Sequence, residues 1–182
     1  MRETPFLKLA AARRSVRKYT PVPVEKEKLL ACLEAARQAP SACNAQPYKF
    51  IVVDDPAAKD KLAKAAFSGL YSATGFAAQA GALVVVVSGK GKLSTWLGDR
   101  VQDTNFRLID IGIAAEHFVL AAQEQGLGTC WLGWFDAKGA AKALGLPAGC
   151  KAEIILSVGY ADEAPSARKR KTMEELASFN GY

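Results

Sequence analysis

The chain has 182 residues, of which half are hydrophobic and 23% are charged, with a formal net charge of +6. This is ordinary globular composition without a low-complexity run or repeat, so we expect a single domain over residues 1–182 that buries its own core. Its apolar runs are too short to span a bilayer and no apolar signal segment opens the sequence, which predicts a cytoplasmic protein without a membrane partner.

Hydrophobic periodicity and turn residues predict alternating helices and strands along the chain. The expected strands are residues 48–53, 82–88, 129–134 and 152–158. The expected helices are residues 25–38, 55–67 and about 103–125, a short helix between Asp136 and Gly145, and a last helix opened by the Thr172–Glu175 capping box. Such alternation would ordinarily favour a doubly wound parallel sheet. However, no Gly-x-Gly-x-x-Gly follows a strand and no P-loop is present.

Two further segments stand out along this pattern. Residues 39–47 are bracketed by Pro40 and Pro47 and rich in short polar side chains, which predicts an ordered loop. Residues 109–122 are apolar except at Asp110, Glu116 and His117. A helix that is apolar nearly all round needs cover from its own core or from a second subunit.

Basic residues gather near both ends of the chain, in Arg13-Arg14-Ser15-Val16-Arg17 and in Arg168-Lys169-Arg170-Lys171. Arginine binds phosphate bidentately, and serine adds a hydrogen bond to the same anion. The two clusters therefore indicate either one phosphate group held from both ends of the fold or two unrelated surface patches. Aromatic residues do not alternate with the basic ones as in a base-stacking surface, so no nucleic-acid partner is expected.

The four cysteines have no metal-ligand spacing, and with a single histidine we expect no metal site. Cys43 and Cys130 are expected to be free thiols that act as small apolar fillers. His117 is expected to be structural or a subunit contact. No nucleophile elbow or catalytic triad is visible.

Four blocks, taken in order, carry a resemblance to a known family. They are residues 13–17, residues 39–47 (Ala-Pro-Ser-Ala-Cys-Asn-Ala-Gln-Pro), residues 126–135 (Gly-Leu-Gly-Thr-Cys-Trp-Leu-Gly-Trp-Phe) and residues 168–171. With these blocks the chain resembles the nitroreductase family of flavin mononucleotide (FMN) oxidoreductases over nearly its whole length. The resemblance implies an α+β fold, with a central, mainly antiparallel sheet flanked by helices. It also implies an interlocked homodimer with FMN at the subunit interface.

The resemblance also implies roles for the two basic clusters. Arg14 would meet the cofactor largely through its backbone. Arg17 would lie near the pyrimidine edge of the flavin, where a fixed cation stabilises the negative charge that two-electron reduction places there. The residues implied to bind the FMN phosphate are Arg13, Ser15, Arg168 and Arg170.

The two middle blocks would meet the flavin ring. Ser41, Asn44 and Gln46 resemble residues that reach the cofactor from the partner subunit, on a loop shaped by Pro40. Gly133 and Trp134 resemble the pair beside flavin N5, although some family members have Glu-Gly there.

The function implied by the resemblance is an FMN-dependent oxidoreductase. It would take a hydride from NADH or NADPH and pass electrons to a nitroaromatic or quinone acceptor by a ping-pong mechanism. Flavin N5 would carry the chemistry, with no catalytic protein residue. Three alternatives stay open: a flavin-binding redox sensor, a reductive dehalogenase and a flavin-fragmenting enzyme. The sequence does not distinguish NADH from NADPH or name the physiological acceptor.

Overall fold

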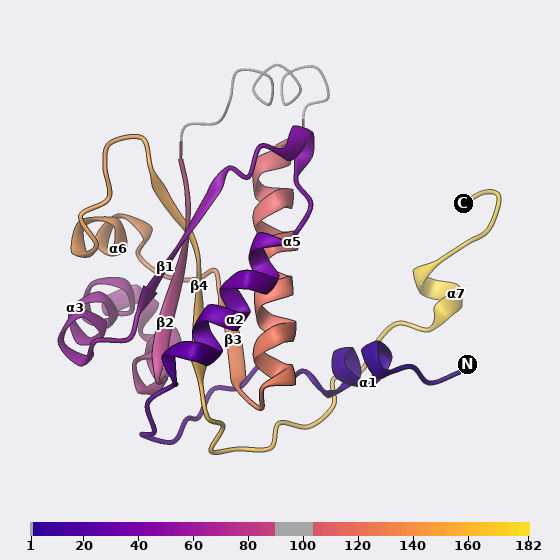
Figure 1. Cartoon of the computed structure of the whole chain (residues 1–182), viewed down its shortest axis with the longest axis horizontal. Helices are drawn as coiled ribbons and strands as arrows, with labels where there is room; N and C mark the ends of the chain where they lie inside the picture. The colour runs from indigo at the N-terminus through magenta and orange to yellow at the C-terminus, as the bar shows by residue number, and fades with distance from the viewer. Residues whose placement is uncertain (1, 90–103) are drawn as a thin grey trace.

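The computed structural model describes residues 2–89 and 104–182 (Figure 1). Its strands are β1 (Tyr48–Val53), β2 (Ala82–Ser88), β3 (Gly128–Leu132) and β4 (Lys151–Gly159). Its α-helices are α1 (Pro5–Ala12), α2 (Lys26–Arg37), α3 (Pro56–Ala66), α5 (Phe106–Glu124), α6 (Ala137–Ala143) and α7 (Met173–Leu176). Two 3-10 segments are η1 (Ala42–Asn44) and η2 (Gly69–Gln79). Within these ranges no helix is both long and apolar enough to cross a membrane.

The four strands form one sheet in the order β1-β2-β4-β3, and every neighbouring pair is antiparallel. Val85, near the middle of β2, lies opposite Ile51 on one side and Ile155 on the other. All seven residues of β2 are buried because it has a strand on each side and a helical layer over each face. The antiparallel sheet flanked by helices is confirmed, and the doubly wound alternative is wrong for this chain.

Successive side chains of β2 point to opposite faces of the sheet, so they pack into two separate cores. Ala82, Val84 and Val86 pack with α2 and α5, where Leu29 and Phe118 are buried. The intervening residues of β2 face α3 and α6 in a second core that includes Leu62, Ala66 and Ala140. Figure 1 shows these helix pairs on opposite sides of the sheet.

Side-chain caps fix the starts of several helices. The Asp55 carboxylate accepts the Ala58 N–H at 2.8 Å and the Asp136 carboxylate accepts the Gly139 N–H at 2.9 Å. The Thr172 capping box opens α7 as expected. Helix α5 begins at Phe106, while residue 103, where the sequence places its start, lies outside the described residues.

The two ends of the chain extend away from this body (Figure 1). Helix α1 was not predicted, although Thr4 and Pro5 form an ordinary helix start, and it contains no buried residue. Beyond α7, Phe179 is 91% exposed. These arms carry apolar side chains that the chain does not cover by itself.

Candidate functional site

The first basic cluster runs along the free edge of β3. The Val16 N–H donates to the Thr129 carbonyl at 2.9 Å, and Ser15 pairs with Thr129 as an isolated parallel bridge. Val16 is buried against Gly128, where a Cβ would lie only 2.8 Å from Val16 Cγ2. This packing on β3 fixes the backbone that carries the arginine side chains.

Backbone pairing brings the end of β4 to the same place. The Thr20 N–H donates to the Tyr160 carbonyl and the Asp162 N–H to the Lys18 carbonyl, both at 2.9 Å. The Glu163 carboxylate then accepts the Arg17 N–H. The chain leading to the second basic cluster is therefore fastened to the first, 146 residues away in sequence.

The two clusters meet in one cavity of about 290 Å³, called the basic cavity below. Its lining consists of Arg13, Arg14, Ser15, Arg17, Arg168 and Arg170, together with Glu163, Pro165 and Ser166. Five arginines and one carboxylate line the cavity, and among these five arginines only Arg13 has an ion-pair partner within the described residues, Glu116 at 3.8 Å. The excess of cationic donors suits a compact dianion such as a phosphate monoester.

Two groups at this site titrate away from their usual ranges. Burial raises the pKa of the Glu116 carboxyl, and the neighbouring Arg13 guanidinium opposes this shift. Burial also raises the pKa of the Cys130 thiol, with Arg17 and Ser15 acting in the opposite direction. Cys130 is therefore a buried neutral thiol at the site, which confirms its expected role as a small filler.

The predicted loop adopts an unusual backbone. Cys43, Asn44 and Gln46 all lie in the left-handed region, with φ values of 51°, 49° and 45°. The Ser41 hydroxyl accepts the Gln46 N–H at 3.0 Å, and the Gln46 side-chain amide donates to Asn44 Oδ1 at 3.1 Å. Residues 41–46, called the 41–46 loop below, thus close on themselves directly after Pro40.

All four cysteines are free, and Cys43 is exposed. The expectation that Cys43 fills apolar space is therefore wrong. It lies in a tight outward turn of the 41–46 loop rather than on a core-facing element.

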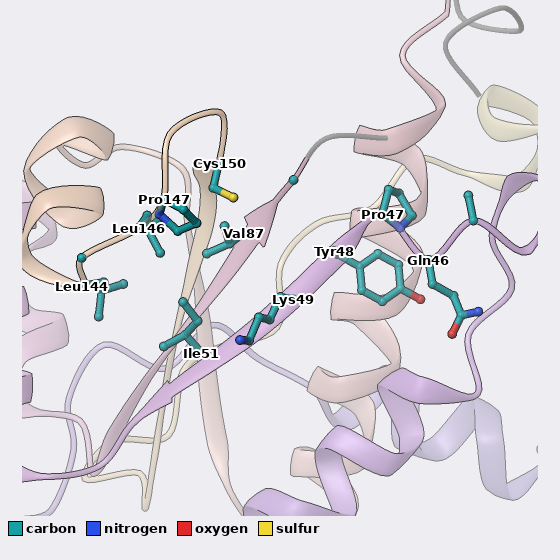
Figure 2. Close-up of a pocket in the computed structure, with 13 residues that line it drawn as sticks. Gln46, Pro47, Tyr48, Lys49, Ile51, Val87, Leu144, Leu146, Pro147 and Cys150 are labelled. Carbon is teal, nitrogen blue, oxygen red and sulfur yellow. The ribbon is translucent and has the colours of Figure 1, made fainter. Parts of the chain in front are cut away.

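The 41–46 loop and the basic cavity do not come together within one chain. The loop is held near the N-terminal end of α5, where Ala42 contacts Asp110. Arg14 instead borders a hollow with Gln123 and Gly126, at the other end of that helix. Gln46 lines a separate, largely apolar cavity of about 560 Å³ between β1 and the loop after α6 (Figure 2).

Gly133 and Trp134 follow β3 on the exposed surface. The Trp134 indole N–H donates to the Leu70 carbonyl at 3.2 Å, and its ring lies 5.4 Å from that of Tyr71 between centroids. These contacts hold the half-exposed indole against η2. A Cβ placed on Gly133 would meet no heavy atom within 4 Å, so open space adjoins its backbone.

Glu163 and Ser166 are residues of the cavity that the sequence did not indicate. No local sequence pattern predicts a role for Glu163, because its hydrogen-bond partner is a backbone N–H near the opposite end of the chain. The six predicted residues of the two basic clusters, in contrast, all line the cavity.

The chain is thus an antiparallel α+β protein with an arginine-lined cavity, suited to an anion, at the edge of its sheet. Comparison with known proteins identifies its family. The sequence model described as "Nitroreductase family" matches residues 10–75 and 70–160. The chain belongs to the nitroreductase family.

Individual relatives agree with this membership. An Archaeoglobus fulgidus protein provisionally named an NADH dehydrogenase/NAD(P)H nitroreductase is 35% identical, over 85% of this chain and 84% of its own length. The solved structure of an FMN-dependent nitroreductase from Clostridium difficile R20291 is 31% identical, with a TM-score of 0.77 over 96% of this chain and 98% of that one. An iodotyrosine deiodinase from Thermotoga neapolitana is 24% identical, over 96% and 97% of the two chains.

Proposed function

We propose that this protein is an FMN-dependent oxidoreductase that takes reducing equivalents from NADH or NADPH and passes them to a second small-molecule acceptor. The observation that carries the proposal is the basic cavity, where five arginines and Ser15 from both ends of the chain converge. The names of the Archaeoglobus and Clostridium relatives support the same cofactor and donor.

The donor set of the basic cavity fits the FMN phosphate. Guanidinium groups and a hydroxyl are suited to phosphate oxygens, and four of the lining residues would bind it: Arg13, Ser15, Arg168 and Arg170. Arg14 would contribute mainly through its backbone. Arg17 lines the same cavity and would place its cation at the pyrimidine edge of the ring.

Bound FMN would supply the two-electron transfer chemistry, so the protein needs no nucleophile of its own. The chain's residues would bind and orient it. The open space beside Gly133 would let a planar ring approach the backbone closely, with Trp134 held aside by η2. The 41–46 loop would approach the same ring from a second subunit.

We also propose that the active form is an interlocked homodimer. An apolar hollow of about 510 Å³ lies between α1, α2 and α5 and includes Phe6, Ile113 and Leu120. Ile109, on the same long helix, is 49% exposed. A second copy of the chain would cover this surface and bring its own 41–46 loop to the basic cavity.

Nitroaromatics and quinones are the proposed acceptors, used in a ping-pong mechanism. The deiodinase relative favours a second candidate, reductive dehalogenation, at the same flavin site. Halogenated phenols therefore belong in the acceptor panel.

The test is anaerobic reduction of the purified protein by NADH and by NADPH, followed by reoxidation with nitroaromatics, quinones and halogenated phenols. We expect one FMN per subunit, loss of its visible absorbance with a nicotinamide, and parallel double-reciprocal plots with the preferred acceptor. A protein that gains no flavin absorbance with FMN would overturn the proposal. Flavin that neither nicotinamide reduces would favour a sensor or a flavin-fragmenting enzyme instead.

A further inference from the structure

The backbone conformation of the 41–46 loop is energetically unfavourable, so contacts with the rest of the protein must stabilise it. Three of its residues, Cys43, Asn44 and Gln46, have side chains yet adopt positive φ values. L-residues with a Cβ rarely occupy this region, and such backbone persists only where surrounding contacts determine it. The loop's internal hydrogen bonds, from Gln46 to Ser41 and to Asn44, join its residues to one another but not to the body of the protein.

Asp110 supplies the connection to the body. It lies on α5 and is only 3% exposed, and its Oδ1 accepts the Ala42 N–H at 3.0 Å. Its neighbour Ile111 is buried in the core between α5 and the sheet. The carboxyl group is therefore held on a rigid element, at the residue where the left-handed turn begins.

A second polar atom under the influence of this carboxyl group is also buried. Burial, and then the charge of Asp110, raise the pKa of the Tyr48 phenol. Within the described residues, Asp110 Oδ2 and the Tyr48 hydroxyl are both buried without a hydrogen-bond partner. Tyr48 follows the loop after Pro47, so the charge of Asp110 acts on a residue just past the end of the loop as well as on Ala42 at its start. A buried polar atom without a hydrogen-bond partner costs free energy, so these two atoms are an exception to the usual pairing of buried polar groups.

We propose that Asp110 is the positioning residue of the 41–46 loop. It touches neither cofactor nor substrate. By fixing the Ala42 amide, it would hold Ser41, Asn44 and Gln46 in the arrangement that meets the partner subunit's flavin. This role rests on the proposed function, whereas the anchoring of the loop itself does not.

The test compares Asp110→Ala with Asp110→Asn, which keeps an oxygen acceptor in nearly the same shape. In the protein as purified, we expect amide exchange of the 41–46 loop to become about tenfold faster in Asp110→Ala and to stay near the wild-type rate in Asp110→Asn. The Kd for FMN should rise about tenfold in Asp110→Ala, with recovery in Asp110→Asn. Asp55→Ala is the matched control, because it removes a carboxylate–amide bond on α3 and should change neither readout.

A second variant removes the loop's donor of the same hydrogen bond. Ala42→Pro deletes the N–H donor and leaves the core untouched, at a first-turn position preceded by the extended Ser41. It should weaken FMN binding about as much as we expect for Asp110→Ala. It also tests the same hydrogen bond if Asp110→Ala fails to fold. Wild-type loop exchange in Asp110→Ala, or wild-type FMN affinity in Ala42→Pro, would overturn the proposal. A wild-type protein that binds no FMN would instead refute the proposed function, while loop exchange would still test the anchor.

Discussion

Arg13 lines the basic cavity and pairs with Glu116 of α5. Replacing it tests whether FMN binding depends on this arginine or only on the overall positive charge of the surface. Arg13→Ala removes one charge-assisted contact, worth about 1.5–3 kcal/mol, and should raise the Kd for FMN about tenfold or more. Fluorescence titration measures this directly. Arg37→Ala is the control, since Arg37 is an exposed arginine already paired with Glu34 at 2.7 Å. Equal FMN affinity in both variants would contradict the assignment.

Cys32 contributes to the loss of stability at alkaline pH. Cys32 is fully buried, and burial raises the pKa of its thiol from 9.0 to about 11. Because the folded pKa is the higher one, the thiol's contribution is fully present below about pH 9 and is lost as the pH rises towards 11. Chemical denaturation at pH 8 and pH 10.5 should therefore show a smaller loss of stability in Cys32→Ala than in wild type. Identical losses would contradict this.

At this scale the sequence predicted the members of the basic cavity well, because arginine next to serine is a local pattern with a chemical reason. It missed Glu163, and it gave Asp110 no functional role. Each acts through a hydrogen bond to a backbone N–H far away in the sequence. Such contacts exist only once the chain is folded, so no spacing rule finds them.

At the scale of elements, the contact between β3 and the first basic cluster can be tested at Gly128. A Cβ there would lie 2.8–3.1 Å from three atoms of the buried Val16 side chain. Gly128→Ala should therefore cost about 1–3 kcal/mol and displace Arg13, Ser15 and Arg17 enough to weaken FMN binding. The double variant Gly128→Ala/Val16→Ala removes the two Cγ contacts, at 2.8 and 3.1 Å, and keeps only the Cβ contact at 3.0 Å, so it should regain part of the affinity. A single variant with wild-type stability and affinity would show that this packing does not position the cluster.

The elements themselves were predictable to different degrees. The bounds of β1 and β2 agree with the sequence because turn residues border compact apolar runs. Helix α1 and the 3-10 segment η2 were missed, since the first buries nothing and the second lacks a helical period among its small residues. The antiparallel sheet was predicted only through the family resemblance, because alternating helices and strands alone favoured a parallel sheet.

At the scale of the whole molecule, the separation of the basic cavity from the 41–46 loop is the strongest reason to expect a dimer. The two regions proposed to form a flavin site lie at different ends of α5 in one chain. The apolar hollow on α5 and the extended terminal arms provide surface for a second copy. The central claim is thus that each FMN site combines the cavity of one subunit with the loop of the other.

Subunit complementation tests this claim most directly. One subunit would carry Arg13→Ala/Arg170→Ala and the other Asn44→Ala/Gln46→Ala, with two affinity tags to isolate the mixed dimer. Each homodimer should bind FMN weakly at both sites. The mixed dimer should have one fully intact site, and thus one FMN per dimer at wild-type affinity. Two weak sites in the mixed dimer, or a protein that sediments as a monomer, would contradict the account.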